Sequence, residues 1–216
     1  MQRREPKLNR PDPARAGRIV GVLLAAGSSL RFGSDKLLQP ATGGRSIAEA
    51  AAGKLLAACD RALAVVGPRS SEQLVERLRL AGLEVVMAHR AQDGMGATLA
   101  AGVNAASQAS GWVVALADMP AIRPASVAAV VQALRRGASI AAPSYRGRRG
   151  HPVGFAAQWL AALTRLAGDS GARKLLDAHA DQVACVDVDD PGILFDVDTD
   201  ADLALLRRFD APTSLG

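Results

Sequence analysis

The stretch that decides the fold reads Val22-Leu23-Leu24-Ala25-Ala26-Gly27-Ser28-Ser29-Leu30-Arg31-Phe32-Gly33-Ser34-Asp35-Lys36. It starts inside a branched apolar run, residues 19–24, which is typical of a strand buried on both faces of a parallel sheet. Small residues follow and let the backbone pass close to a ligand. The N–H groups of such a turn suit phosphate oxygens, and Arg31 and Lys36 add two cations. The stretch predicts a strand and a polyphosphate-binding loop, with an ordinary strand-to-helix connection as the alternative.

Spacing excludes two common phosphate loops. A Walker loop has four residues between its glycines and then Gly-Lys-Ser/Thr, whereas five residues separate Gly27 from Gly33 and Ser-Asp-Lys follows. The dinucleotide fingerprint needs a glycine where Ser29 stands. The pattern L-A-A-G-x-S-x-R-F-G-x-D-K instead resembles the opening signature of nucleotidyltransferases with a GT-A-like α/β fold. It is most similar to the MobA-like branch, the molybdenum cofactor cytidylyl- and guanylyltransferases.

Composition limits the class of protein. The chain has 216 residues, 49% apolar and 3% aromatic, which fits one domain with a core of Ala, Val and Leu. No apolar run approaches the ~18–20 residues that span a bilayer. We expect a disordered basic leader at 1–17, one nucleotidyltransferase domain at 18–210 and a flexible tail at 211–216. Cys59 and Cys185 fit no metal spacing and indicate reduced thiols in a cytoplasm.

The net charge of +5 raises the possibility of nucleic-acid binding. Much of the excess lies in the expected leader, and the aromatic side chains that stack single strands are nearly absent. We therefore expect the charge to attract small anionic substrates, with no nucleic acid or membrane as partner.

The rest of the chain alternates predicted strands with amphipathic helices, which favours a mainly parallel sheet covered on both faces. Ser70 is the predicted N-cap of the second helix, with Gln73 as its capping-box partner. The predicted strands are 61–66, 83–87, 112–117, 138–142, 153–155 and 183–188. The predicted helices are 45–59, 70–80, 94–106, 124–136, 158–166 and one that ends at Ala178.

A second motif, Gly94-Met95-Gly96-Ala97-Thr98-Leu99, opens a predicted helix whose glycines leave N–H groups available to a ligand. It resembles the G-M-G-x-S-L segment that lies beside the nucleotide in the family, and a plain helix entry is the alternative. The resemblance thus implies a nucleotide site made of Leu24, Ala25, Ala26, Gly27, Ser28, Ser29, Lys36, Gly94, Met95, Gly96 and Thr98.

A carboxylate follows the apolar run 112–117 directly, in Asp118-Met119-Pro120. At the C-terminal end of a central parallel strand it would lie over the ligand crevice, and Mg²⁺ takes one or two such carboxylates plus substrate phosphates. A helix cap is the alternative for Asp118. Near the end of the chain, Asp196-Val197-Asp198-Thr199 resembles the family's closing D-x-D-T. We expect Asp198 to be the second metal ligand, with Asp196 as its rival, and Thr199 to cap the last helix.

Residues 144–155 combine arginine, glycine and His-Pro, which suggests a loop over the site. The R-G-H-P-V pattern and the later Gly168-Asp169-Ser170-Gly171-Ala172-Arg173 resemble elements that face the acceptor in the family. They imply an acceptor site of Arg149, Gly150, His151, Pro152, Asp169 and Arg173. Arg146, Arg148 and Arg149 could hold the phosphate of the acceptor, but we expect at least two of the three to belong to a solvated run of charges instead. His151 could orient the acceptor, act as a base or serve structure alone.

The resemblance implies a three-layer α/β/α sandwich around a mixed, mostly parallel sheet, and Mg²⁺-dependent transfer of a nucleoside monophosphate to a phosphate-bearing acceptor. Lys36, Arg31 and Asp118 would be the catalytic residues, because phosphoryl chemistry needs positioning and charge neutralisation. Leu24-Ala25-Ala26-Gly27 favours CTP, with molybdopterin as acceptor, whereas Asp35-Lys36 is common among guanylyl members. The alternatives are a guanylyltransferase, a sugar- or isoprenoid-phosphate nucleotidyltransferase, and a chaperone that hands a cofactor to a molybdoenzyme.

Overall fold

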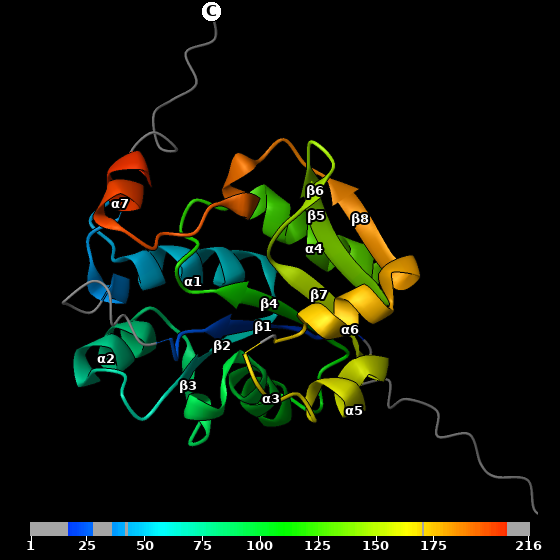
Figure 1. Cartoon of the computed structure of the whole chain (residues 1–216), viewed down its shortest axis with the longest axis horizontal. Helices are drawn as coiled ribbons and strands as arrows, with labels where there is room; N and C mark the ends of the chain where they lie inside the picture. The colour runs from blue at the N-terminus through cyan, green and yellow to red at the C-terminus, as the bar shows by residue number, and fades with distance from the viewer. Residues whose placement is uncertain (1–16, 28–35, 42, 170, 207–216) are drawn as a thin grey trace, which may run out of the picture.

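The computed structural model describes residues 17–27, 36–41, 43–169 and 171–206. Within these residues one eight-stranded sheet has the order β3-β2-β1-β4-β7-β5-β6, with β8 paired to β5 (Figure 1). The neighbours among the first four strands are parallel, as are β5 and β8, whereas β7 is antiparallel to both β4 and β5. The strands are β1 (Ile19–Leu24), β2 (Arg61–Val66), β3 (Glu84–Met87), β4 (Gly111–Leu116), β5 (Ile140–Tyr145), β6 (Arg148–Arg149), β7 (Val153–Ala156) and β8 (Val183–Asp187).

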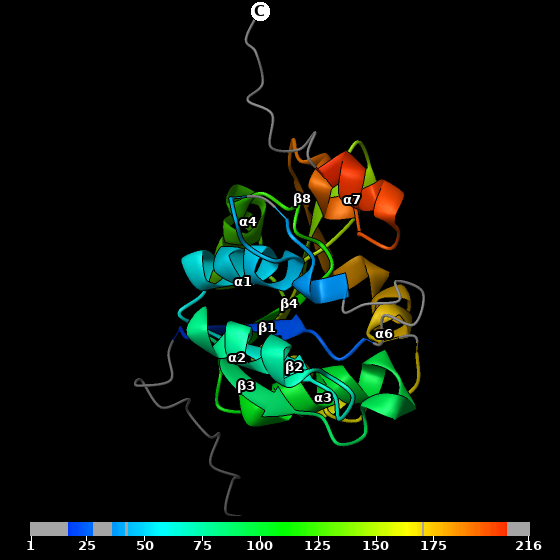
Figure 2. The ribbon, with the colours of Figure 1, turned by 90° about the vertical axis from the view of Figure 1, so that its left-hand side faces the viewer.

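Helices cover both faces of this sheet (Figure 2). The α-helices are α1 (Ile47–Ala58), α2 (Glu72–Leu80), α3 (Met95–Ala105), α4 (Pro124–Arg135), α5 (Leu160–Leu163), α6 (Arg173–Ala178) and α7 (Asp200–Leu206). Short 3-10 turns lie at Lys36–Leu38, Ala91–Asp93, Ala157–Trp159, Ala180–Gln182 and Pro191–Leu194. Buried residues of α1, α2 and α4 share one core cluster, and those of α3, α5 and α6 share the other. The fold is therefore the expected three-layer α/β/α sandwich around a mixed sheet.

The strand pattern follows from burial on both faces. All six residues of β1 are buried, and its apolar side chains divide between the two core clusters: Ile19 and Leu23 belong to the cluster of α1, whereas Val22 and Leu24 belong to that of α3. This alternation is the period of two expected of a strand. It places Leu24, the last residue of β1, on the α3 side of the sheet.

Several predicted element boundaries need correction. Ser71 rather than Ser70 caps α2, since its Oγ accepts from the Leu74 N–H at 3.2 Å, while the Ser70 Oγ accepts from the Gly67 N–H at 3.0 Å and closes the preceding turn. The predicted helix 158–166 is a 3-10 turn followed by four α-helical residues.

The first helix begins at Ile47, two residues later than predicted. Ser46 is its N-cap, and the side chains of Ser46 and Glu49 each bond the other's backbone in a capping box.

The ends of the chain lie mostly outside the described residues. Of the expected leader only Gly17 is described, and the expected tail is not described at all. Among the described residues, the helices are all too short or too polar to cross a bilayer.

Candidate active site

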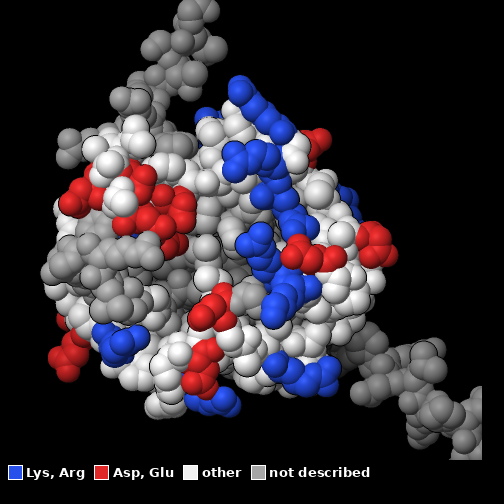
Figure 3. All heavy atoms as spheres, in the orientation of Figure 1, with Lys and Arg blue, Asp and Glu red and all other residues white. Residues whose placement is uncertain are grey.

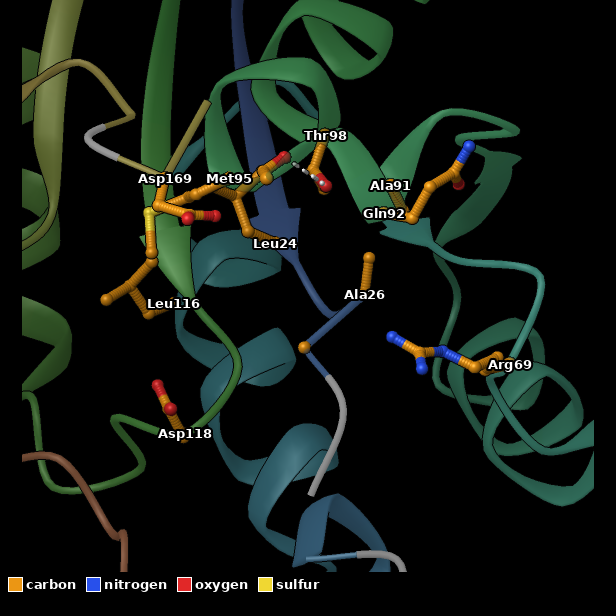
Figure 4. Close-up of a pocket in the computed structure, with 12 residues that line it drawn as sticks. Leu24, Ala26, Arg69, Ala91, Gln92, Met95, Thr98, Leu116, Asp118 and Asp169 are labelled. Carbon is orange, nitrogen blue, oxygen red and sulfur yellow. Dashed lines mark hydrogen bonds between the residues drawn. The ribbon is translucent and has the colours of Figure 1, made fainter. Parts of the chain in front are cut away.

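The site begins where β1 and β4 end side by side. Leu24 pairs with Leu116, and the Ala117 N–H donates to the Leu24 carbonyl at 3.1 Å. Because the two strands are parallel, the segments that follow them leave the sheet at the same edge. One segment carries Ala26 and Gly27, and the other carries Asp118 (Figure 4).

Three charged side chains meet at this edge. Lys36 Nζ lies 3.0 Å from Asp118 Oδ2 and 2.9 Å from Asp198 Oδ1. The Val197 N–H donates to the Asp118 carbonyl at 2.9 Å, which holds the segment of Asp198 against the end of β4. The structure thus brings together Lys36, Asp118 and Asp198, which are far apart in the sequence.

The ionisation of this cluster follows from its charges. Burial alone would lower the pKa of Lys36, but the negative charges of Asp118 and Asp198 and the hydrogen bonds to both outweigh it and raise the pKa. The lysine therefore stays an ammonium. Asp196 stands close by: burial raises its pKa, and the charges of Asp198 and Asp118 raise it further.

The two carboxylates on Lys36 are suitable ligands for a hard divalent cation. Oxygens from Asp118 and Asp198 approach one point from two segments, and Mg²⁺ takes one or two carboxylates while keeping water and substrate oxygens. Within the described part of the chain, His, Cys, Asp and Glu form no group of three or more that could hold a metal alone. The residues present fit a metal shared with substrate phosphates, and Asp196 makes no contact with Lys36 among the described bonds.

A cavity of about 380 Å³ opens beside this cluster (Figure 4). Most of the expected nucleotide-site residues line it: Leu24, Ala26, Gly27, Gly94, Met95 and Thr98, together with Asp118. Ala25 does not, because its side chain is buried in the core on the α1 side. Ser28, Ser29 and Arg31 lie outside the described residues.

The sequence analysis missed two polar residues of this cavity, Arg69 and Gln92. Arg69 follows β2, and Gln92 lies in the 3-10 turn after β3. The rule that ligands bind beyond the carboxyl ends of parallel strands applies to β2 and β3 as well as to β1 and β4. It could have identified both residues.

The two glycines at the start of α3 have a different role from the one predicted. The Gly96 N–H donates to the Gly168 carbonyl at 2.8 Å and the Gly94 N–H to the Ala91 carbonyl at 3.1 Å, so neither is available to a ligand. A Cβ on Gly96 would stand 2.8 Å from backbone atoms of Ala167, and one on Gly94 would collide with Gly168. These positions are glycine because the 167–168 backbone packs directly against the helix start.

A larger cavity of about 700 Å³ adjoins the first. Leu24, Met95, Leu116 and Asp169 line both cavities. Of the expected acceptor residues, Arg149, Gly150, His151, Asp169 and Arg173 line the larger one, whereas Pro152 is buried and does not. Its other walls are apolar and include Leu99, Val114, Val153, Phe155 and Leu176. The larger cavity therefore combines an apolar floor with two arginines.

The arginines of the 146–149 turn do not act alike. Arg146 lies over the Tyr145 ring at 5.1 Å, and neither it nor Arg148 lines either of the two cavities described above. Arg149 lines the larger cavity, with Asp177 at 3.5 Å. Figure 3 shows basic side chains in a band along β6 and α6, across this face from the acidic side chains near α7. An anion entering the larger cavity meets this basic side first.

Known proteins resemble this chain over most of its length. The model of the MobA-like NTP transferase domain matches residues 21–183. Nicotine blue oxidoreductase of Paenarthrobacter nicotinovorans is 32% identical over 190 residues, covering 84% of this chain and 92% of its own. The purine catabolism protein PucB of Bacillus subtilis is 30% identical over 209 residues, covering 88% and 96%.

Solved structures of the same type were also found. The Mycobacterium sp. strain JC1 homologue of Rv0371c is 30% identical with a TM-score of 0.78, covering 90% of this chain and 99% of its own. Rv0371c of Mycobacterium tuberculosis, solved in complex with manganese, is 27% identical with a TM-score of 0.69, covering 88% and 97%. With the family model matched over most of its length, this chain belongs to the MobA-like NTP transferases and is a nucleotidyltransferase.

Proposed function

We propose that this nucleotidyltransferase moves cytidine monophosphate from CTP to the phosphate group of a molybdopterin-type acceptor and releases pyrophosphate. The observation that carries the proposal is the position of Lys36, Asp118 and Asp198 at the end of β4, beside two adjoining cavities. One cavity is available for each substrate, and Asp118 of the charged cluster lines the smaller one.

The smaller cavity is assigned to the nucleoside triphosphate. Ala26 and Gly27 follow β1 and bring backbone close to it, and no atom of the described residues lies within 4 Å of where a Cβ on Gly27 would stand. Arg69 and Gln92 add hydrogen-bonding groups for the base or ribose. The Leu24-Ala25-Ala26-Gly27 sequence supports CTP as the donor.

Asp118 and Asp198 would hold the divalent ion, which we expect to be Mg²⁺. When bound, it supplies positive charge to the phosphate oxygens. A related structure contains manganese, which supports a divalent ion in this site. Lys36 supplies the chain's own positive charge and is held in place by the same two carboxylates.

The reaction needs no covalent intermediate on the protein. An oxygen of the acceptor phosphate attacks the α-phosphorus in line, the new P–O bond forms, and the bond to the β-phosphate oxygen breaks so that pyrophosphate leaves. A phosphate monoester is already anionic at neutral pH, so the step requires no strong base. Lys36 neutralises charge that develops on the α-phosphate, and Arg31 and the 27–30 amides are proposed to hold the β- and γ-phosphates.

The larger cavity is assigned to the acceptor. Its apolar floor suits a flat ring system, and Arg149 and Arg173 suit a phosphate, since guanidinium groups pair with phosphate oxygens. A molybdopterin-type molecule carries both features. Its product would pass to a molybdoenzyme or that enzyme's chaperone. The free thiols of Cys59 and Cys185 fit a cytoplasmic location.

The test is pyrophosphate release from CTP, GTP, ATP and UTP with molybdopterin as acceptor. We expect release with CTP, a loss of roughly a hundredfold or more in Asp118→Asn and Asp198→Asn, and a smaller loss in Asp196→Asn. Release with GTP alone would identify a guanylyltransferase. Release only with a sugar or isoprenoid phosphate as acceptor would identify the protein as a sugar- or isoprenoid-phosphate nucleotidyltransferase.

Two further outcomes would overturn the proposal. Tight binding of molybdopterin without pyrophosphate release from any triphosphate would favour a cofactor chaperone. Oxidation or reduction of nicotine blue, without nucleotidyl transfer, would instead indicate an activity like that of the oxidoreductase relative.

A further inference from the structure

His151 occupies a defined place in the wall of the larger cavity. It lies between β6 and β7, and its backbone N–H donates to the Ile193 carbonyl at 2.9 Å. The neighbouring Gly150 packs so closely on Ile193 that a Cβ there would collide with the same carbonyl. The backbone that carries the imidazole is therefore held on the 191–194 turn, and the side chain is partly exposed to the cavity.

The two ring nitrogens of His151 are not equivalent. Nδ1 is buried and has no hydrogen-bond partner among the described residues. In this part of the chain it is the one buried side-chain nitrogen or oxygen atom that lacks a partner. A neutral imidazole carries its proton on one nitrogen only. Leaving an N–H buried without a partner is costly, so the proton belongs on Nε2, at the accessible edge of the ring. There it can bond to water or to a ligand.

The surroundings of His151 also favour the neutral ring. Burial lowers its pKa below the ordinary value of a histidine, the positive charge of Arg149 acts in the same direction, and only Asp118 opposes them. The buried Nδ1 cannot reach a substrate proton, and Nε2 already carries one.

We infer that His151 binds the acceptor as a neutral hydrogen-bond donor, from Nε2–H to an oxygen of its phosphate group, and is not a general base. The inference rests on the proposed function for the identity of the acceptor. Arg149 and Arg173, which line the same cavity, supply charge to the phosphate group, and the His151 N–H adds a directional hydrogen bond. This division suits an acceptor that needs orientation and no deprotonation.

The first test reads the ring directly and needs no substrate. The chain has three histidines, so ¹⁵N-histidine NMR of the full-length protein, with His151→Gln to assign the signal, resolves the state of each ring. At pH 7 we expect His151 to be neutral with its proton on Nε2. A proton on Nδ1, or an imidazolium, would overturn the inference whether or not the protein transfers nucleotides.

The second test separates donor from base by kinetics. With CTP and molybdopterin, His151→Ala should raise the KM for molybdopterin roughly tenfold with a smaller change in kcat, and His151→Gln, which keeps an N–H near the same place, should stay within about threefold of wild type. His89→Gln, on an exposed histidine that lines neither cavity, should match wild type. Equal loss of kcat in the Ala and Gln variants, with the acidic limb of the pH profile gone, would assign a base.

Wild-type protein that releases no pyrophosphate under any condition would refute the proposed function. The NMR result would still decide the state of His151.

Discussion

Lys36 places one ammonium against two carboxylates, so its removal leaves Asp118 and Asp198 facing each other without a cation. A divalent ion that uses the same oxygens must compete with that ammonium. We therefore predict that Lys36→Met binds Mn²⁺ alone more tightly, by about tenfold, because opposite charges at this separation are worth a few kcal/mol near a surface. Mn²⁺ electron paramagnetic resonance measures the affinity directly. The same variant should lose roughly a hundredfold or more in pyrophosphate release.

Lys174→Met is the matched control, since it removes an exposed lysine of α6 that lines neither cavity. It should leave Mn²⁺ affinity unchanged. An unchanged or weaker affinity in Lys36→Met would mean that the carboxylates that hold the lysine are not the ones that take the metal.

The sequence predicts that Lys36 and Asp118 meet, because both follow strands of a parallel sheet at its carboxyl edge. It does not predict that one ammonium contacts Asp118 and Asp198 together, since that depends on how the 196–198 segment returns to β4. The role of Gly96 could not be predicted from the sequence either. The reason for that glycine is a backbone more than seventy residues away, and helix-start patterns carry no such information.

At the scale of elements, α4 depends on a carboxylate from elsewhere in the chain. Its N-cap, Arg123, makes no side-chain capping bond. Asp190 is 2% exposed and accepts from the Arg123 N–H at 2.8 Å, the Ser126 hydroxyl at 2.6 Å and the Gly192 N–H at 3.0 Å. Asp190→Ala leaves these buried donors unpaired, so it should lower the free energy of unfolding by about 2–4 kcal/mol.

Urea denaturation measures this change, and the neighbouring Asp189→Ala is the control. The Asp189 side chain is exposed, and only its backbone carbonyl contacts Arg123. The free energy of unfolding of Asp189→Ala should stay within about 0.5 kcal/mol of the wild-type value. Equal losses of stability in the two variants would show that Asp190 does not anchor the start of α4.

The start of α3 gives a second prediction at this scale. Helix propensity alone favours alanine over glycine by about 1 kcal/mol. At Gly96 the added Cβ would meet the Ala167 backbone at 2.8 Å, and neighbouring atoms would have to move to relieve this contact. Gly96→Ala should therefore lower the free energy of unfolding by about 1–3 kcal/mol, and it should also weaken CTP binding because Asp169 lies on the displaced segment.

Gly53→Ala in α1 is the counterpart, measured by the same denaturation and nucleotide titrations. Its Cβ would meet only the flexible end of the Arg45 side chain. It should leave CTP affinity unchanged and stability unchanged or higher. A destabilised Gly53→Ala beside a neutral Gly96→Ala would contradict the close packing of α3 on the 167–168 segment.

Local patterns identify most elements here but not their finer boundaries. Ser70 and Ser71 are both acceptable N-caps by type, and only the turn after β2 decides that Ser70 bonds back to Gly67. The alternation of strands and helices also says nothing about β7, which inserts antiparallel between β4 and β5. Strand order depends on long-range pairing, and residue periodicity does not encode it.

At the scale of the whole molecule, the arrangement of the sheet explains why the site has two cavities. The parallel strands β1 to β4 and the segments that follow them supply most of the smaller cavity, whereas β7, α6 and their neighbours supply most of the larger one. The family resemblance predicts this mixed sheet, which the structure has. Leu24 and Leu116 belong to both cavities because β1 and β4 are adjacent central strands.

The stability of the whole fold should also report on Cys59, at the end of α1. Burial raises the pKa of this thiol to about 12, and the charge of Asp60 adds to the effect. In the unfolded chain the thiol ionises near its ordinary pKa of about 8.5. A raised folded pKa means that its contribution to stability is complete below the unfolded pKa and is lost as pH rises toward 12.

Wild-type protein should therefore lose stability with rising pH above about 9 more steeply than Cys59→Ala, by at most about 1.4 kcal/mol per pH unit. Urea midpoints from pH 8 to 11 measure the difference in slope, because every other ionisable group is common to both proteins. Cys185→Ala removes an exposed thiol of β8 and should keep the wild-type slope. If Cys59→Ala followed the wild-type slope instead, the thiol would ionise as easily in the folded protein as in the unfolded one, and α1 would not shield it from water.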